Sequence, residues 1–157
     1  MNIKLVVGSE KLNYNVEEEL FFDIDHISRT LQTHAGQLAW WASLLAIKEK
    51  EYANKKVEFD GREGEMSIFL RTDEDTAKRY NKKVTEGVIN AELSSNEELM
   101  ILRKDLNETK LQIGYLKAMV KGMSDRSPLL ATAGSIRRSE LEAGMRSVIK
   151  KTTKKHK

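Results

Sequence analysis

The chain has 157 residues, of which 39% are hydrophobic and 32% are charged, and its formal net charge is +3. It contains no cysteine, which excludes disulfides, thiolate metal sites and cysteine nucleophiles and is compatible with a reducing cytoplasm. No apolar run approaches the roughly 20 residues that a membrane-spanning helix requires, so we expect a soluble cytoplasmic protein without a membrane partner. The high charge content and the single proline indicate a mainly α-helical chain.

The first 24 residues are predicted to form an amino-terminal arm. Apolar and polar residues alternate over 3–7 and precede a Gly-Ser pair, which predicts a short strand or an unsettled segment. The apolar run at 20–24 is predicted to be extended and to pack on neighbouring helices. Asp23 or Asp25 is suited to cap the next helix, because a short polar side chain accepts hydrogen bonds from first-turn backbone N–H groups.

A long amphipathic helix is predicted from Asp25 to about Phe59. Its apolar residues recur at spacings of three and four, with breaks at His34 and Lys48, and they are Ile27, Leu31, Leu38, Trp41, Leu45 and Tyr52. Trp40 and Trp41 are adjacent, so they lie about 100 degrees apart around a helix and cannot both face one seam. The pair therefore indicates a broad buried face or an interface, or else one ring serves as a base-stacking platform.

After this helix the sequence predicts a turn and a short extended connector. Two glycines within 60–64 are typical of a turn, and the alternation of apolar and polar residues over 66–71 predicts a β-like connector. A third helix is predicted from Thr76 to Leu93. The acidic residues at 73–75 are suited to cap that helix, and this interpretation is preferred to a magnesium site.

The third predicted helix carries four basic residues in one compact patch, Lys78, Arg79, Lys82 and Lys83. Two pairs within this patch are one helical turn apart, so their charges lie close together. Such a patch can neutralise several backbone phosphates of a nucleic acid. Alternatively, the four residues form an ordinary solvated helix face.

A heptad pattern dominates residues 95–123, interrupted only by Thr109. Its apolar seam consists of Leu99, Leu102, Leu106, Ile113, Leu116, Val120 and Met123. Ser94 or Ser95 is predicted to cap this helix, and Pro128 to kink or restart it. The seam is either the core of one chain or a joint between copies. Because thin helices enclose little volume, we expect the carboxy-terminal helices to assemble into an oligomeric ring or bundle.

The end of the chain is strongly basic. Residues 137–157 contain eight basic and two acidic residues, a local surplus of six positive charges. The last part of this segment, 146–157, is interpreted as a basic tail that binds a polyanion or simply keeps the terminus solvated.

No motif that supports catalysis is present in the sequence. There is no glycine-rich phosphate loop, zinc-protease motif or nucleophile elbow. His26 and His34 share a helix face but lie about 12 Å apart, which is too far for one metal ion without further ligands. We therefore predict a non-enzymatic protein with no catalytic residues, no cofactor and no metal.

Several segments, taken in order, resemble the UvsY-type recombination mediators of tailed phages. The resemblance covers about residues 20–140 and is carried by LFFDID at 20–25, NKKVEFDGR at 54–62, KVTEGV at 83–88, LKAMVKGMSDR at 116–126 and IRR at 136–138. Two features depart from the family pattern. Pro128 interrupts a helix that looks continuous in the family, and the lysine-rich end extends beyond the matched region.

The resemblance implies that Lys55, Lys56 and Arg62 contact the DNA backbone and that the carboxy-terminal helices assemble subunits into a ring. The chain then divides into the arm, a DNA-binding region at 25–93 with its basic turn, an oligomerisation region at 94–145 and the tail. The implied function is to bind single-stranded DNA without sequence specificity and to load a RecA-like recombinase in place of single-strand-binding protein. Two other functions stay open: a phage inhibitor or adaptor acting by protein contact on a DNA-processing complex, and a purely structural helical oligomer.

Overall fold

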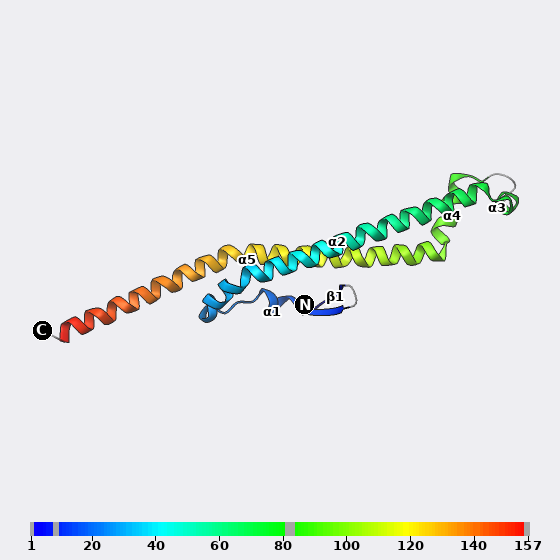
Figure 1. Ribbon diagram of the computed structural model, residues 1–157. Coiled ribbons are helices and arrows are strands. Elements are labelled where there is room, and N and C mark those ends of the chain that lie inside the picture. The colour runs from blue at the N-terminus through cyan, green and yellow to red at the C-terminus, as the bar shows by residue number, and fades with distance from the viewer. Residues whose placement is uncertain (1, 8–9, 81–83, 156–157) are drawn as a thin grey trace. The chain divides into compact units, whose positions relative to one another are not determined.

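The computed structural model is mainly helical, with one short β-hairpin at the amino terminus (Figure 1). It describes residues 2–7, 10–80 and 84–155, and it describes side chains in these ranges except at 10, 24 and 146–155. The elements are β1 (Asn2–Val7), β2 (Glu10–Asn15), α1 (Val16–Leu20), the 3-10 turn η1 (Ile24–His26), α2 (Ile27–Thr72), α3 (Glu74–Arg79), α4 (Glu86–Ser95) and α5 (Glu97–Lys155). Within the described ranges, no helix combines the length and the apolar character needed to cross a membrane.

The chain forms two compact units, and the two long helices contribute to both. One unit contains residues 1–44 and 116–157, and the other contains residues 45–115. We call them the hairpin unit and the tip unit. In each unit, a part of α2 packs antiparallel to a part of α5.

The hairpin unit begins with two antiparallel strands. Ile3 pairs with Tyr14 and Leu5 pairs with Leu12, so these four side chains share the inner face. Ile3 and Leu5 are buried. The strand predicted at 3–7 is therefore confirmed, whereas its polar partner β2 was not predicted.

Aromatic rings pack beneath the hairpin. Tyr14 meets the rings of Trp40 and Trp41 edge to face, at centroid distances of 5.5 and 4.8 Å. Trp41 is buried, whereas Trp40 keeps 42% of its surface exposed. This division matches the prediction that adjacent residues of a helix face different directions.

The helical part of the hairpin unit is held by a small apolar core and close contacts at glycine. Ile27 of α2 packs with Leu130 and Ala133 of α5. A Cβ atom on Gly122 would lie 3.2 Å from both terminal carbons of Leu20, so glycine lets the end of α1 approach α5 closely. The run at 20–24 is only partly extended, because it contains the end of α1 and the start of η1.

The tip unit is built from the second half of α2, the short helices α3 and α4, and the first part of α5. Leu70, Ile89, Leu93 and Leu99 form its buried core, with Phe59, Met66 and Val84 packed against them. The turn predicted at 60–64 and the connector predicted at 66–71 are wrong, because both lie inside α2. Phe59, Met66 and Leu70 follow the helical spacing, and their packing outweighs a cost of about 1 kcal/mol for each interior glycine.

Two of the helix boundaries predicted between residues 73 and 96 differ from the structure, and a third is confirmed. The helix predicted from Thr76 to Leu93 is two helices, since α3 ends at Arg79 and α4 begins at Glu86. Asp73 caps α3 as predicted, because its side chain accepts a 2.8 Å hydrogen bond from the Thr76 backbone N–H. Neither Ser94 nor Ser95 caps α5, because both lie in α4 and their hydroxyls donate to α4 carbonyl groups.

Asn96 caps α5, accepting a 3.0 Å hydrogen bond from the Leu99 backbone N–H. The predicted interruption at Pro128 is absent, since α5 continues through this residue. Pro128 cannot donate to the carbonyl of Ser124, but both residues are exposed, so water can satisfy that carbonyl.

The heptad seam is packed within the single chain. In the tip unit, Leu99 and Ile113 are buried and Leu102 and Leu106 are half-buried. In the hairpin unit, Leu116 and Met123 are buried and Val120 is half-buried. Covering the seam therefore does not require a second copy, and assembly into a ring stays a prediction.

Candidate nucleic-acid interface

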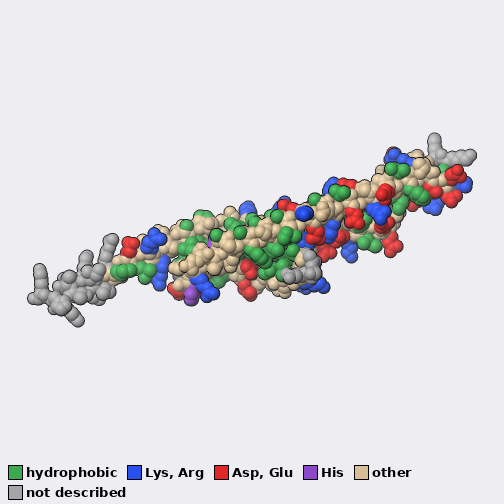
Figure 2. Space-filling view, in the orientation of Figure 1, with side chains coloured by type: hydrophobic (Ala, Val, Ile, Leu, Met, Phe, Trp, Pro, Cys, Tyr) green, Lys and Arg blue, Asp and Glu red, His purple; other side chains and the backbone are tan. Residues whose placement is uncertain are grey.

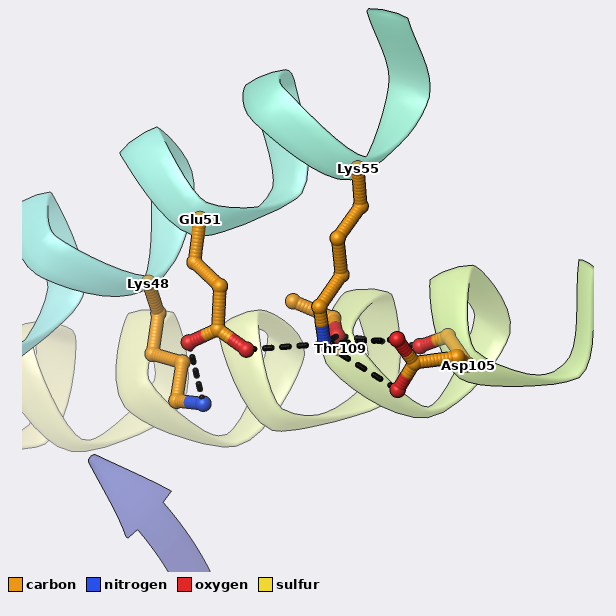
Figure 3. Close-up of polar contacts among 5 residues, drawn as sticks. All are labelled: Lys48, Glu51, Lys55, Asp105 and Thr109. Atoms are coloured by element: carbon orange, nitrogen blue, oxygen red, sulfur yellow. Dashed lines mark hydrogen bonds and ion pairs between the residues drawn. The ribbon is translucent and has the colours of Figure 1, made fainter. Parts of the chain in front are cut away.

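Among the predicted DNA contacts that the structure describes, Lys55 has the most ion-pair and hydrogen-bond partners. Its ammonium lies 2.8 Å from Oε1 of Glu51 and 2.9 Å from Oδ2 of Asp105, and it donates a 3.0 Å hydrogen bond to Oγ1 of Thr109 (Figure 3). Burial opposes the charge on Lys55, but the hydrogen bonds to Glu51 and Asp105 outweigh it and hold the pKa of Lys55 above its ordinary value. A DNA phosphate would have to displace these partners.

The same network includes a second, buried lysine. Lys48 is only 2% exposed, and its ammonium lies 2.6 Å from Oε2 of Glu51. Burial would raise the pKa of Glu51, but hydrogen bonds from Lys48 and Lys55 lower it below its ordinary value. With Asp105, the network contains two cations and two anions, so it adds no net charge to the interior of the tip unit.

Arg62 forms a second link between α2 and α5. Its Nε atom lies 3.5 Å from Glu98, and Nη1 lies 3.1 Å from Glu65. Lys55 and Arg62 are seven residues apart along α2, and their partners Asp105 and Glu98 are seven residues apart in the reverse direction. This spacing is that of antiparallel helices in register, so two basic residues that were predicted to contact DNA connect the helices.

The other predicted contacts are exposed and have acidic neighbours. Lys56 lies 3.1 Å from Asp60, Lys78 lies 3.4 Å from Asp75, and Arg79 lies 3.5 Å from Glu92. Figure 2 shows Asp and Glu side chains interspersed with Lys and Arg around α3 and α4. Exposed ion pairs are weak, so these three residues can exchange a carboxylate for a phosphate at little cost. Lys82 and Lys83 lie outside the described residues.

A hollow in the hairpin unit is lined by apolar and basic side chains from two segments that are far apart in the sequence. Its volume is about 450 Å³, and it is lined by Ile27, Leu31, Gly134, Arg137, Arg138 and Leu141, among others. The first two belong to α2 and the others to α5. The Ile-Arg-Arg segment at 136–138 is a recognisable motif in the sequence, but its position opposite the start of α2 could not be predicted without the fold.

A buried polar cluster in the hairpin unit was not predicted. Arg126 donates a 3.0 Å hydrogen bond to the backbone carbonyl of Glu19, and its guanidinium lies 5.5 Å from the centre of the Phe22 ring. His34 is 7% exposed, and neither ring nitrogen has a hydrogen-bond partner among the residues that the structure describes. Burial, and secondly the charge of Arg126, lower the pKa of His34 below its ordinary value. The cluster fastens the amino-terminal arm to α5.

The described residues do not bring together three or more potential metal ligands. At 73–75, the carboxylate of Asp73 accepts from both the backbone N–H and the hydroxyl of Thr76, as a capping residue does. No known family model matches the chain, and no solved structure matches it.

Proposed function

We propose that this chain is a non-enzymatic recombination mediator. It binds single-stranded DNA without sequence specificity and promotes loading of a RecA-like recombinase in place of single-strand-binding protein. The proposal draws its family from the resemblance in segment order over residues 20–140. It draws its main physical support from the carboxy-terminal part of α5.

That part of α5 combines helical backbone with a strong excess of positive charge. The helix continues to Lys155, and no acidic residue follows Glu142 in the sequence. Each phosphate that a cation neutralises releases counterions, so a helix of this composition has affinity for single-stranded DNA of any sequence. Lys56, Arg62, Lys78 and Arg79 offer further exposed contacts.

Self-association would multiply these modest contacts. Several copies on one strand bind with a high effective concentration, so a ring or bundle holds DNA more tightly than a single chain does. A DNA strand that is held in this way is then available to the recombinase when single-strand-binding protein dissociates.

The test is binding of dye-labelled single strands, followed by fluorescence anisotropy over a range of salt concentrations. We expect binding to strands of unrelated sequence and a steep loss of affinity with added salt. Arg137→Glu with Arg138→Glu should weaken binding at every sequence. The matched control is Lys11→Glu with Lys4→Glu, which reverses two charges on the outer face of the hairpin.

A second assay tests mediation directly. The protein is added to a RecA-like recombinase and DNA coated with single-strand-binding protein, and the DNA-dependent ATPase rate of the recombinase is measured. We expect shorter lag times with the wild-type chain and less shortening with the charge-reversed pair. No binding at low salt, or binding that ignores salt, contradicts the proposal.

A further inference from the structure

The hollow described above is open because small residues line it on the α5 side. Ala131, Gly134 and Ser135 contribute little side-chain volume there. A Cβ atom on Gly134 would lie 3.0 Å from Cδ1 of Leu31, so α2 and α5 approach each other closely at this point. The apolar side chains of Ile27, Leu31 and Leu141 therefore surround a space that no residue of the lining fills.

The charge around the hollow is positive. Arg137 lies 3.2 Å from Glu140, whereas Arg138 forms no ion pair with any residue that the structure describes. No carboxylate is among the described residues that line the hollow. Beyond Glu140 and Glu142, the sequence at 146–157 is basic, so the net charge of this end of the chain also favours an anion.

We infer that this hollow receives one unstacked base of single-stranded DNA while Arg138 binds a neighbouring phosphate. The inference rests on the proposed function and adds a location and a binding mode to it. Single strands present apolar base faces and phosphates at a regular spacing, and proteins bind them by combining cationic contacts with apolar or planar surfaces for the bases.

An acidic peptide is the main alternative occupant. It would satisfy Arg138, but the carboxylates that bring it there are poor partners for the apolar lining, since burial of an unpaired charge is unfavourable. A base is large and flat and carries no charge. The combination of an apolar space with a cation at its edge therefore favours nucleic acid.

The experiment compares two ligands of equal length and charge: oligo(dT) and the same backbone without bases. The wild-type chain should bind oligo(dT) about tenfold more tightly than the baseless strand, because each held base adds contact energy. Ala131→Phe places a ring in the hollow and should lower the affinity for oligo(dT) toward that of the baseless strand. Ser28→Phe, from the α2 side, repeats the test through a different element.

Two control variants distinguish binding in the hollow from binding elsewhere on α5. Ser124→Phe adds the same ring at an exposed α5 position outside the hollow and should leave both affinities unchanged. Arg138→Gln should weaken both ligands equally and reduce the salt dependence by about one phosphate contact. Circular dichroism melting establishes that each variant is folded.

Four results would overturn the inference. Equal wild-type affinity for the two strands would mean that only the backbone is bound, and the proposed function would survive. Equal losses in Ala131→Phe and Ser124→Phe would show that the hollow holds no base. Competition by polyglutamate that is as strong as that by oligo(dT) at matched charge would show that the site recognises negative charge alone. Absence of binding to either strand would instead remove the proposed function and the inference together.

Discussion

Lys55 and Asp105 are fifty positions apart in sequence, yet the ammonium of one lies 2.9 Å from the carboxylate of the other. The ammonium also reaches Thr109, the only residue that interrupts the heptad seam. The polar residue in the seam thus accepts a hydrogen bond from the facing helix. A polar contact of this kind favours one alignment of two helices over its neighbours.

The first prediction concerns the coupling between these two residues. In a double-mutant cycle with Lys55→Met and Asp105→Leu, each single variant should lower the free energy of unfolding, because it leaves a partner without its counter-ion. The coupling energy should be about 1 kcal/mol, since the pair is partly exposed. Urea unfolding measures it. Lys56→Met with Asp60→Leu is the exposed control pair and should give a smaller value.

The same variants separate structure from DNA contact. If Lys55 mainly connects the two helices, Lys55→Met should lower stability more than it lowers affinity for single-stranded DNA. Lys56→Met should do the reverse. Should Lys55→Met abolish binding while leaving the unfolding curve unchanged, the connecting role would be the wrong interpretation.

The second prediction concerns acid sensitivity. The pKa of His34 is lowered in the folded chain, so the folded state binds a proton less readily than the unfolded state does. The resulting stability is fully present above the ordinary histidine pKa of about 6.5 and is lost as the pH falls below that value. Thermal melting between pH 7.5 and 5.5 should show this loss.

His34→Leu should flatten that part of the pH profile, because the titrating group is removed. His26→Gln is the control, since His26 is exposed and its ring is hydrogen-bonded to the exposed side chain of Asp23. A profile that is unchanged in His34→Leu would show that another group causes the acid sensitivity.

The third prediction concerns the two glycines inside α2. Gly61 and Gly64 have open space where a side chain would begin. Gly61→Ala and Gly64→Ala should each raise the free energy of unfolding by about 1 kcal/mol, because alanine restricts the unfolded chain and favours the helix. Urea titrations at low protein concentration provide the measurement. A lower stability, or a change in mass by light scattering, would indicate that another molecule packs against these glycines.

The fourth prediction concerns the seam itself. Leu116 is fully buried, so Leu116→Ala should lower the free energy of unfolding by about 2 to 5 kcal/mol. Leu111, on the same helix, is 55% exposed, and Leu111→Ala should change it by about 0.5 kcal/mol or less. A Leu116→Ala variant that dissociates without losing subunit stability would assign the residue to a joint between copies.

The helical class and many of the buried residues could be predicted from the sequence alone. Spacings of three and four identified Ile27, Trp41, Leu99 and Leu116, all of which are buried. These predictions succeeded because helical periodicity is a local property of the chain. The alternation at Ile3 and Leu5 succeeded for the same reason.

The failures arose where tertiary packing overrode a local signal. Gly61 and Gly64 are typical turn residues, but the core contacts of Met66 and Leu70 keep α2 continuous through them. The partner of β1 was missed because β2 is polar on its outer face. The network at Lys55 and the hollow beside Arg138 depend on how distant segments align, which no local pattern encodes.

The contact between Arg126 and Glu19 has a consequence for sequence drift in the arm. Arg126 donates to the main-chain carbonyl of Glu19, an acceptor that every amino acid supplies. Position 19 is therefore free to vary without loss of this hydrogen bond, whereas position 126 has to retain a long donor side chain. Related chains should tolerate many residues at the first position and few at the second.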